Sequence, residues 1–498
     1  MTAGVDAADA FAASRELFET VASWLGGAEA SGLEHAELED RLDVEAREVF
    51  RRLFQDHLDL RAHNEARLGD VVDADGVARP CVESGHRRGL CTIFGPVVVS
   101  RRAYRHRGHT NLHPADGALN LPVERHSHGL RRLAAIEASR GSFDAAVEAV
   151  GRATGQTLGK RQVEELTLAA ADDFNDFYAT RSAKAGEPTD VLVVSCDGKG
   201  IVMRPDALRE PTAKAAANAT PKLAGRLSKG EKRNRKRMAE VGAVYDITPA
   251  PRTPNDIFPT TDQARADPPA ARNKWLTASV VDDAATVVAG IFDEANRRDP
   301  DHQRTWIALV DGNNHQIDRI QAEAAARQVN VPIVIDFVHV IEYLWKAAWS
   351  FHKEGDPDAE TWVRAKALEV LAGHATRVAA AIRRKATYHH LDPAQRANAD
   401  TCARYLTNKA SYLDYPTALT NGWPIATGVI EGACRSLVKD RMDITGARWG
   451  LDGAEAILKL RALRCNGDFN TYWQFHLTQE RQRTHQSRYA DSLIPLAA

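Results

Sequence analysis

Apolar residues recur at helical spacing along the first part of the chain. Two such series occur, made up of Phe11, Leu17, Phe18, Val21 and Leu25, then Leu38, Leu42, Ala46, Val49 and Leu53. Residues three, four and seven positions apart share one face of a helix, so the pattern predicts a helical region over residues 1–75. The region is acidic, and we therefore expect it to pack or self-associate and not to contact a polyanion such as DNA directly.

A change to β-forming residues follows in residues 76–120. Two β-rich runs flank Gly95-Pro96 in the stretch LCTIFGPVVVSRRAYR, which predicts a hairpin. The second strand leads into a basic cluster that Tyr104 interrupts, made up of Arg101, Arg102, Arg105, His106, Arg107 and His109. A basic ribbon of this kind suits a DNA groove. The alternative is an exposed charged strand edge that discourages aggregation.

Residues 121–185 return to a helical pattern. A helix that begins near Phe143 is followed by a turn at Thr154-Gly155 and a second helix near Leu158. This arrangement resembles a helix-turn-helix, in which Lys160 and Arg161 would lie early on the recognition helix. An ordinary helical hairpin is the alternative.

Three short apolar runs further along each end in an aspartate. The runs VLVV, WIALV and VPIVI are typical of buried strands. The acids that follow them are Asp197, Asp311 and Asp336, and His339 comes three residues after the last. An acid at the end of a buried strand is a frequent metal ligand or catalytic carboxylate. Each one taken singly can equally be a helix N-cap or a turn residue.

The order of the surrounding elements predicts an α/β core. Strands at EVGAVYDI and WLTASVV and a helix over residues 283–298 complete the order of three strands, helix, strand, helix and strand, which is that of a ribonuclease-H-like mixed sheet. We expect an α-helical insertion before the chain returns to this core. The expected divisions are a first core part over 186–345 with a basic loop at 204–240, the insertion at 346–422, a second core part at 423–470 and a tail at 471–498. The basic loop is either solvated or a phosphate clamp.

A late stretch, GVIEGACRSLVKDRMDITGARW, begins with helical spacing. Glu431, Arg435 and Lys439 lie four residues apart and share one face of an α-helix. A carboxylate in the first turn is stabilised by the helix dipole, and the two cations form a track suited to phosphates. A solvated face with ion pairs between neighbouring turns is the alternative.

Several of these stretches together carry a family resemblance. They are CDGKG at 196–200, VDGNNHQID at 310–318, DFVH at 336–339, GVIEGACRSLVKDRMDITGARW at 428–449 with LRAL after it, and FGPVVVSRRAYR at 94–105. In this order they resemble the DDE transposases of the Mutator-like group, and most of all the Kra-type bacterial insertion-sequence transposases. The resemblance spans most of residues 90–475.

The resemblance implies a ribonuclease-H-like catalytic core preceded by helical and β-hairpin DNA-binding regions. It implies that Asp197, Asp311 and Glu431 are catalytic and hold two Mg²⁺ or Mn²⁺ ions. Asp336 and His339 have a supporting role, and Asp336 is the alternative second acid. The resemblance also implies binding to the terminal inverted repeats of an element and to target DNA, by a homodimer or a larger assembly. The expected DNA contacts are Lys199, Lys232, Arg233, Arg235, Lys236, Arg435, Lys439, Arg441, Arg448 and Trp449, with Arg101, Arg102, Arg105, Lys160 and Arg161 in the amino-terminal regions. Trp449 is expected either to stack on an unpaired base or to pack in the core.

Net charge, cysteine spacing and the lengths of apolar runs limit the partners, metal sites and cellular location that we expect. A net charge of −2 means that any DNA-binding surface must be local. The six cysteines contain no Cys-x-x-Cys pair, which argues against a disulfide framework and a tetrahedral zinc site. We find neither a signal peptide pattern nor an apolar run of roughly 20 residues, so we expect no membrane partner and a cytoplasmic, nucleoid-associated protein. Two alternatives to a transposase stay open, namely a nuclease or resolvase that only hydrolyses DNA and a catalytically silent DNA-binding derivative.

Overall fold

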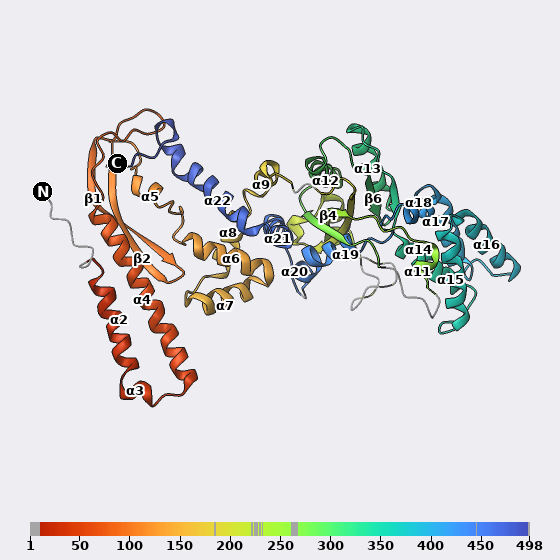
Figure 1. Ribbon diagram of the computed structural model, residues 1–498, viewed down its shortest axis with the longest axis horizontal. Coiled ribbons are helices and arrows are strands. Elements are labelled where there is room, and N and C mark those ends of the chain that lie inside the picture. The colour runs from red at the N-terminus through yellow and green to blue at the C-terminus, as the bar shows by residue number, and fades with distance from the viewer. Residues whose placement is uncertain are drawn as a thin grey trace. The chain divides into compact units, whose positions relative to one another are not determined.

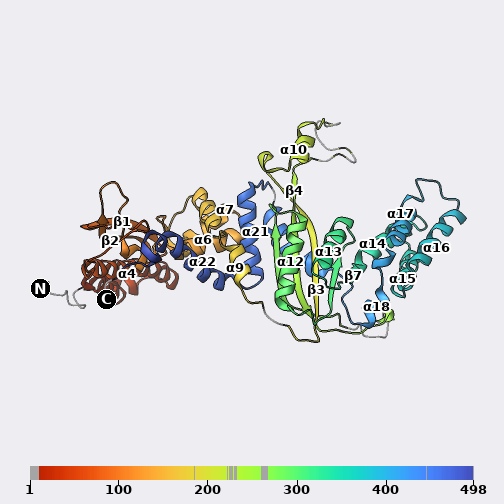
Figure 2. The ribbon, with the colours of Figure 1, turned by 90° about the horizontal axis from the view of Figure 1, so that it is seen from above.

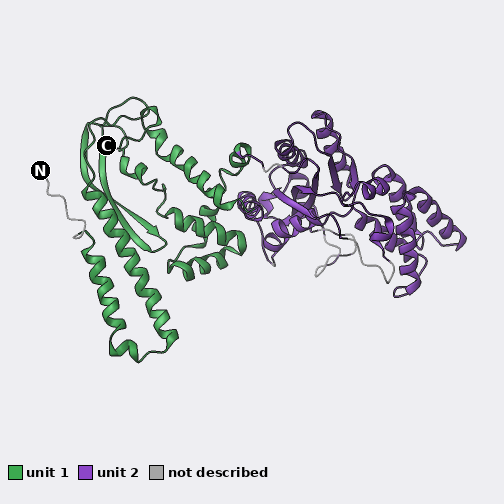
Figure 3. Ribbon diagram, viewed as in Figure 1, with its two compact units in different colours: residues 1–180, 467–498 green, residues 181–466 purple. Residues whose placement is uncertain are grey.

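The computed structural model describes residues 10–183, 186–220, 223, 228, 231, 233–259, 267–444 and 446–496, which fall in two compact units (Figures 1 and 3). Unit 1 takes in residues 1–180 and 467–498, and unit 2 takes in residues 181–466. Lys232, an expected DNA contact, lies outside the described residues.

Unit 1 begins with the helices that the apolar spacing predicts. They are α2 (Ala12–Leu25), α3 (Ala28–Ser31) and α4 (His35–His63). A capping box between Glu34 and Glu37 begins the long helix α4. The guanidinium of Arg41 lies 4.1 Å from the centre of the Trp24 ring, so α2 and α4 pack against each other as a helical hairpin.

The predicted β-hairpin is present, but its turn differs from the expected one. Strands β1 (Cys81–Thr92) and β2 (Gly95–Arg105) pair antiparallel, and Thr92 is the partner of Gly95. Ile93 and Phe94 therefore form the turn, and Gly95 begins β2 with a φ of 132°, a conformation that favours glycine. A small core joins the hairpin to α4 and the following loop, made up of Leu58, Leu90, Val97, Val99 and Leu121.

The rest of unit 1 is helical and includes the carboxyl-terminal segment. Its helices are α5 (Pro114–Ala118), α6 (His128–Arg140), α7 (Phe143–Thr154), α8 (Lys160–Ala169), α9 (Phe174–Thr180) and α22 (Phe469–Thr484). Helix α7 ends at Gly155, whose φ of 67° forms the left-handed cap that the turn signal predicts. Residues 471–498, expected to be a tail, contain most of α22. The Tyr472 hydroxyl donates to the Ala170 carbonyl (2.8 Å), and the ring of His476 is fully buried beside Asp173, so this segment is part of the unit 1 core.

Unit 2 is a mixed α/β unit built on a five-stranded sheet (Figure 2). The strand order is β5-β4-β3-β6-β7; β3, β4 and β5 are antiparallel neighbours, and β6 and β7 run parallel to β3. The strands are β3 (Val191–Val202), β4 (Lys236–Ile247), β5 (Ala271–Ser279), β6 (Trp306–Val310) and β7 (Ile333–Ile335). Strands β3 and β4 are longer than predicted, because they continue as a two-stranded ladder into the region expected to be loop.

Helices cover both faces of this sheet. Gly242 of β4 lies against Ile291 of α12 (Ala284–Arg298), and its partner in β3 is Cys196, so Cys196 faces the same side. Asp197, one residue further along β3, faces the opposite side and contacts Cys434. Helix α13 (Asn314–Ala326) packs beside α12, which gives the predicted order of strands and helices.

The expected helical insertion lies between β7 and residue 428. Its helices are α14 (Phe337–Ala348), α15 (Pro357–Leu371), α16 (Ala375–Tyr388), α17 (Ala397–Asn408) and α18 (Tyr415–Thr420). Unit 2 also contains α10 (Glu210–Ala217) and α11 (Pro254–Ile257) between its first strands and ends with α21 (Leu451–Cys465). Among the described residues, no helix has both the length and the apolar character needed to cross a membrane.

Candidate acidic site

Two of the expected acids follow neighbouring parallel strands. Asp311 comes directly after β6 and Asp336 directly after β7, and the carboxyl ends of parallel strands lie at the same edge of a sheet. One oxygen of each acid has a local role, since Asp311 Oδ1 accepts the Asn313 N–H (2.8 Å) and Asp336 Oδ1 accepts the Val338 N–H (2.8 Å). The turn at Asp311 and the N-cap at Asp336 therefore each use only Oδ1, so Oδ2 of both acids can take part in the site.

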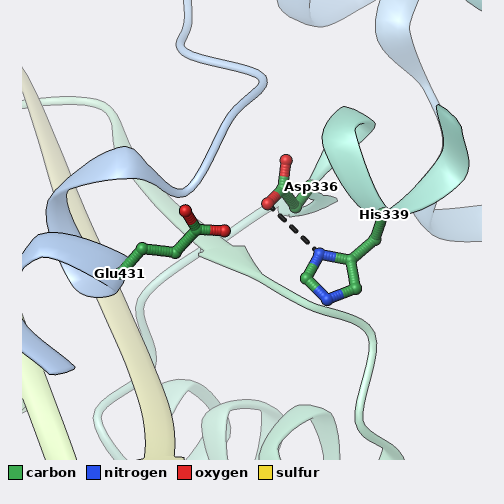
Figure 4. Close-up of side chains that lie close together, drawn as sticks. All are labelled: Asp336, His339 and Glu431. Carbon is green, nitrogen blue, oxygen red and sulfur yellow. Dashed lines mark hydrogen bonds and ion pairs between the residues drawn. The ribbon is translucent and has the colours of Figure 1, made fainter. Parts of the chain in front are cut away.

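Asp336, His339 and Glu431 form a close cluster. One ligand atom of each lies within 4.8 Å of the others, and no other set of three acidic, histidine or cysteine side chains in the described part of the chain does so. Figure 4 shows the three side chains pointing toward one another, Asp336 and His339 from the start of α14 and Glu431 from α19 (Gly428–Ala433). Asp336 is fully buried, whereas Glu431 is exposed, so the cluster opens to solvent on the Glu431 side.

Hydrogen bonds hold the buried member of the cluster. The Thr427 hydroxyl donates to Asp336 Oδ2 and also lies 3.5 Å from Glu431 Oε1. His339 Nδ1 lies 3.3 Å from Asp336 Oδ2. The hydrogen bond to Asp336 raises the pKa of His339, and the negative charges of Asp336, Asp311 and Glu342 add to this effect against the desolvation of the ring. The carboxylates beside His339 therefore favour its protonated form more than water does.

Asp197 borders the cluster through a cysteine. Its Oδ1 accepts the Gly198 N–H (2.7 Å), and its Oδ2 lies 3.3 Å from the Cys434 sulfur. Burial raises the pKa of the Cys434 thiol, and the charges of Asp197 and Glu431 raise it further. Cys434 therefore stays a neutral thiol that can donate to Asp197, and it lies within the electrostatic reach of both acids.

Asp311 lies near the same edge but outside the close cluster. Its charge contributes to the raised pKa of His339. The pKa of the Cys196 thiol is raised mainly by burial and by the charge of Glu240, and the charges of Asp197 and Asp311 add smaller effects. The trio expected to share two cations, Asp197, Asp311 and Glu431, does not come within 4.8 Å as a set in the described residues. Asp336 and His339, expected to support the site, instead form the close cluster with Glu431.

The helix that carries Glu431 is not a regular α-helix. Residues Cys434–Lys439 form a π-helix, so Arg435 and Lys439 do not continue the α-helical face on which the sequence pattern placed them. Arg461 of α21 donates to the carbonyls of Ser436 (2.8 Å) and Leu437 (3.1 Å) within the π segment. Arg435 is exposed and lies 3.5 Å from Asp440, and Lys439 is also exposed.

Arg441 and Trp449, two expected DNA contacts, are buried. The Arg441 guanidinium lies 4.7 Å from the centre of the Trp449 ring, and burial lowers its pKa to about 10. The Trp449 indole N–H donates to the Met442 carbonyl (3.0 Å), and the residue is 5% exposed. Of the two expectations for Trp449, the structure places it in the core. Arg448 beside it is exposed.

The other expected cations differ in how they are placed. Lys199, Arg233, Arg235 and Lys236 are exposed on or beside the β3–β4 ladder, and Lys236 lies 4.0 Å from Asp443. Those of unit 1 have acidic or backbone partners. These contacts are Arg101–Asp116 (2.7 Å), Arg102 to the Glu65 carbonyl (2.9 Å), Arg105–Glu83, Lys160–Asp144 (2.7 Å) and Arg161–Glu165 (3.0 Å). The positive charge of the hairpin is therefore partly neutralised within the protein.

The ligand atoms of the cluster fit a divalent cation. Carboxylate oxygens suit Mg²⁺ and Mn²⁺, and an imidazole suits transition metals better than Mg²⁺. Asp336, His339 and Glu431 are the residues placed to hold one ion, with Asp197 and Asp311 bordering them. Thr427 and Cys434 were missed by sequence reasoning, because no local pattern marks a hydroxyl or thiol that pairs with an acid from another element.

Comparison with known proteins does not identify a function for this chain. No family model matches the chain, and no curated protein matches it.

Proposed function

We propose that this protein is a DDE transposase of an insertion sequence, which binds the element ends and catalyses metal-dependent DNA cleavage and strand transfer. The observation that carries the proposal is the gathering of four acids from distant parts of the chain at one edge of the unit 2 sheet. Ligand atoms of Asp336 and Glu431 lie within 4.8 Å of each other. The charges of Asp197 and Asp311 act on the thiols of Cys196 and Cys434 and on the imidazole of His339 in and beside the same cluster.

The sheet supports the proposed class of core. A ribonuclease-H-like sheet has three antiparallel strands followed by two strands parallel to the first, with a helix before each of the last two. The order β5-β4-β3-β6-β7 and the positions of α12 and α13 agree with this plan. The insertion between β7 and the helix of Glu431 lies where the Mutator-like resemblance implies it.

Three of the acids in the proposed site have hydrogen-bond partners. Gly198 and Cys434 hold Asp197, Asn313 holds one oxygen of Asp311, and Val338 and Thr427 hold Asp336. Bound Mg²⁺ or Mn²⁺ ions would supply Lewis-acid activation of a phosphodiester and of the attacking water or 3′-hydroxyl. The proposed primary ligands are Asp197, Asp311 and Glu431, with Asp336 as the alternative second acid and His339 beside it.

The surface around the acids supplies positive charge for a DNA backbone. Lys199 lies two residues beyond Asp197 on β3, close enough for its charge to act on Cys434. Arg435 and Lys439 are exposed on the π segment that follows the helix of Glu431. Such contacts position a backbone without reading its sequence. The proposed setting is the nucleoid in a bacterial cytoplasm, where two copies of the protein would pair two element ends.

Cleavage of a labelled element end in the presence of Mg²⁺ tests the proposal. The expected result is a cut at the end of the terminal repeat, followed by joining of the freed 3′ end to a second DNA. Cleavage without joining would favour the hydrolytic nuclease instead, and binding without cleavage would favour a silent DNA-binding derivative.

A further inference from the structure

Tyr405 brings the helical insertion into contact with the acidic site. It lies on α17, and its ring stacks on that of Tyr343 from α14, with ring centres 4.0 Å apart and an angle of 15° between the planes. The stack places the Tyr405 ring against α14, the helix that Asp336 caps. The Tyr405 hydroxyl oxygen is buried and has no hydrogen-bond partner in the described part of the chain.

The hydroxyl points at the backbone that follows Asp311. A Cβ placed on Gly312 would lie 3.3 Å from the Tyr405 hydroxyl oxygen and 3.1 Å from Cδ1 of Ile335, the residue before Asp336. The φ of Gly312 is 95°, which also favours glycine there. The hydroxyl therefore lies against the residue next to Asp311, at the edge where the two strand-end acids meet.

An unpaired buried hydroxyl is costly and calls for an explanation. A buried polar group without a partner destabilises the fold, whereas a phenylalanine would keep the ring stack at no such cost. Burial raises the pKa of Tyr405, and the negative charges of Asp311 and Asp336 raise it further, so the hydroxyl stays protonated and can donate to an acceptor. The acid next to Gly312 in the sequence is Asp311, whose Oδ1 accepts the Asn313 N–H.

We propose that Tyr405 is a positioning residue for Asp311, and that its hydroxyl donates a hydrogen bond to the Asp311 carboxylate when that carboxylate turns to bind a divalent cation. This inference rests on the proposed function. Carboxylates that bind metals are commonly held by hydrogen bonds from a second layer of residues, and loss of such a partner weakens metal binding 10- to 100-fold. The insertion thereby contributes directly to the acidic site.

Binding of Mn²⁺, followed by electron paramagnetic resonance of the free ion, tests this inference without DNA or turnover. Tyr405→Phe keeps the ring stack and removes only the hydroxyl, and we expect Mn²⁺ affinity to fall about 10-fold. Tyr343→Phe, which alters the other ring of the same stack, is the matched control and should leave the affinity unchanged. The thermal midpoint of cation-free Tyr405→Phe should equal or exceed that of the unaltered protein, because an unpaired group has been removed.

A double-variant comparison identifies the acceptor. In an Asp311→Asn background, Tyr405→Phe should cause no further loss of Mn²⁺ affinity, because the carboxylate through which Tyr405 acts is gone. Unchanged affinity in Tyr405→Phe, or an equal loss in both backgrounds, would overturn the inference. If Glu431→Gln and Asp311→Asn themselves bind Mn²⁺ like the unaltered protein, or if that protein binds none, the proposed function fails as well. If Glu431→Gln and Asp311→Asn lose Mn²⁺ affinity but Tyr405→Phe does not, only the role of Tyr405 is overturned.

Discussion

The hydroxyl of Thr427 donates a hydrogen bond to the buried carboxylate of Asp336, across 91 residues of sequence. This bond ties the segment that introduces Glu431 to the end of β7. It closes the helical insertion on itself, because the insertion leaves the sheet at Asp336 and returns at Thr427. The acidic site is therefore assembled only when the insertion has folded.

We predict that Thr427→Val lowers stability and disturbs the acidic site. Valine has nearly the same shape but removes the hydroxyl donor to Oδ2 of the fully buried Asp336 and leaves that oxygen only its contact with His339, which costs about 1–3 kcal/mol. Urea unfolding of the cation-free protein measures this loss. Thr427→Ser keeps a hydroxyl and is the control, and equal stabilities for the valine and serine variants would contradict the account.

The pH dependence of stability should reveal the pair of His339 and Asp336. The pKa of His339 is raised above its ordinary value of 6.5 by the hydrogen bond to Asp336. A group whose pKa is higher in the folded state stabilises that state fully below the unfolded pKa, and this contribution fades as the pH rises through the folded value. The stability difference between the cation-free protein and His339→Gln should therefore be largest below pH 6.5 and decline at higher pH. A stability difference that grows with pH would show that folding lowers the pKa of His339, contrary to this account.

Buried Trp449 should matter for folding and not for DNA binding alone. Trp449→Ala removes a large core side chain, and we expect a loss of about 3–5 kcal/mol in unfolding free energy. Arg448→Ala changes an exposed neighbour and should leave stability within about 0.5 kcal/mol while weakening DNA binding. If Trp449→Ala is as stable as the unaltered protein and only loses affinity for unpaired DNA, base stacking is the correct role.

The cations in the sequence before and at the start of β4 should contribute a salt-dependent part of DNA affinity. Replacing Lys232, Arg233, Arg235 and Lys236 by alanine should weaken binding to all sequences alike. Each lost phosphate contact should reduce the slope of log affinity against log salt by about 0.9. A set of titrations at several salt concentrations measures this slope. An unchanged slope would mean that these side chains are only solvated.

Strands β6 and β7 and the acids that end them were predictable because a strand signal is local, whereas the expectation that Asp197 ends its strand is wrong, since β3 continues to Val202. Runs such as WIALV mark a buried strand by composition alone, and the aspartate after each run is visible in the sequence. The helices of residues 1–75 followed from apolar spacing in the same way. These features depend on neighbouring residues, so no knowledge of the tertiary structure was needed.

The features that escaped prediction depend on contacts between distant residues. The π segment at Cys434–Lys439 has carbonyls bonded to Arg461, and nothing in its own sequence marks a departure from an α-helix. The burial of α22 rests on contacts with Ala170 and Asp173, some 300 residues earlier in the chain. The closeness of Asp336 and Glu431 likewise depends on how the insertion returns to the sheet.

The choice between Asp311 and Asp336 as second acid has a direct test. If Asp311 is the second metal ligand, Asp311→Asn should reduce cleavage by orders of magnitude, whereas Asp336→Asn should be milder. Single-turnover cleavage of a labelled element end at saturating protein measures both. The reverse order would assign the second position to Asp336, which the structure places beside Glu431.

The central claim is that the acids at this sheet edge perform phosphodiester chemistry, and Glu431→Gln tests it most directly. Glutamine keeps the shape and hydrogen-bonding capacity of Glu431 but removes its charge, so several kcal/mol of metal-dependent transition-state stabilisation should be lost. A gel-shift assay and a Mg²⁺ cleavage assay on the same element end give the two readouts. The account predicts nearly unchanged binding with cleavage reduced by orders of magnitude, and a cleavage rate equal to that of the unaltered protein would contradict it.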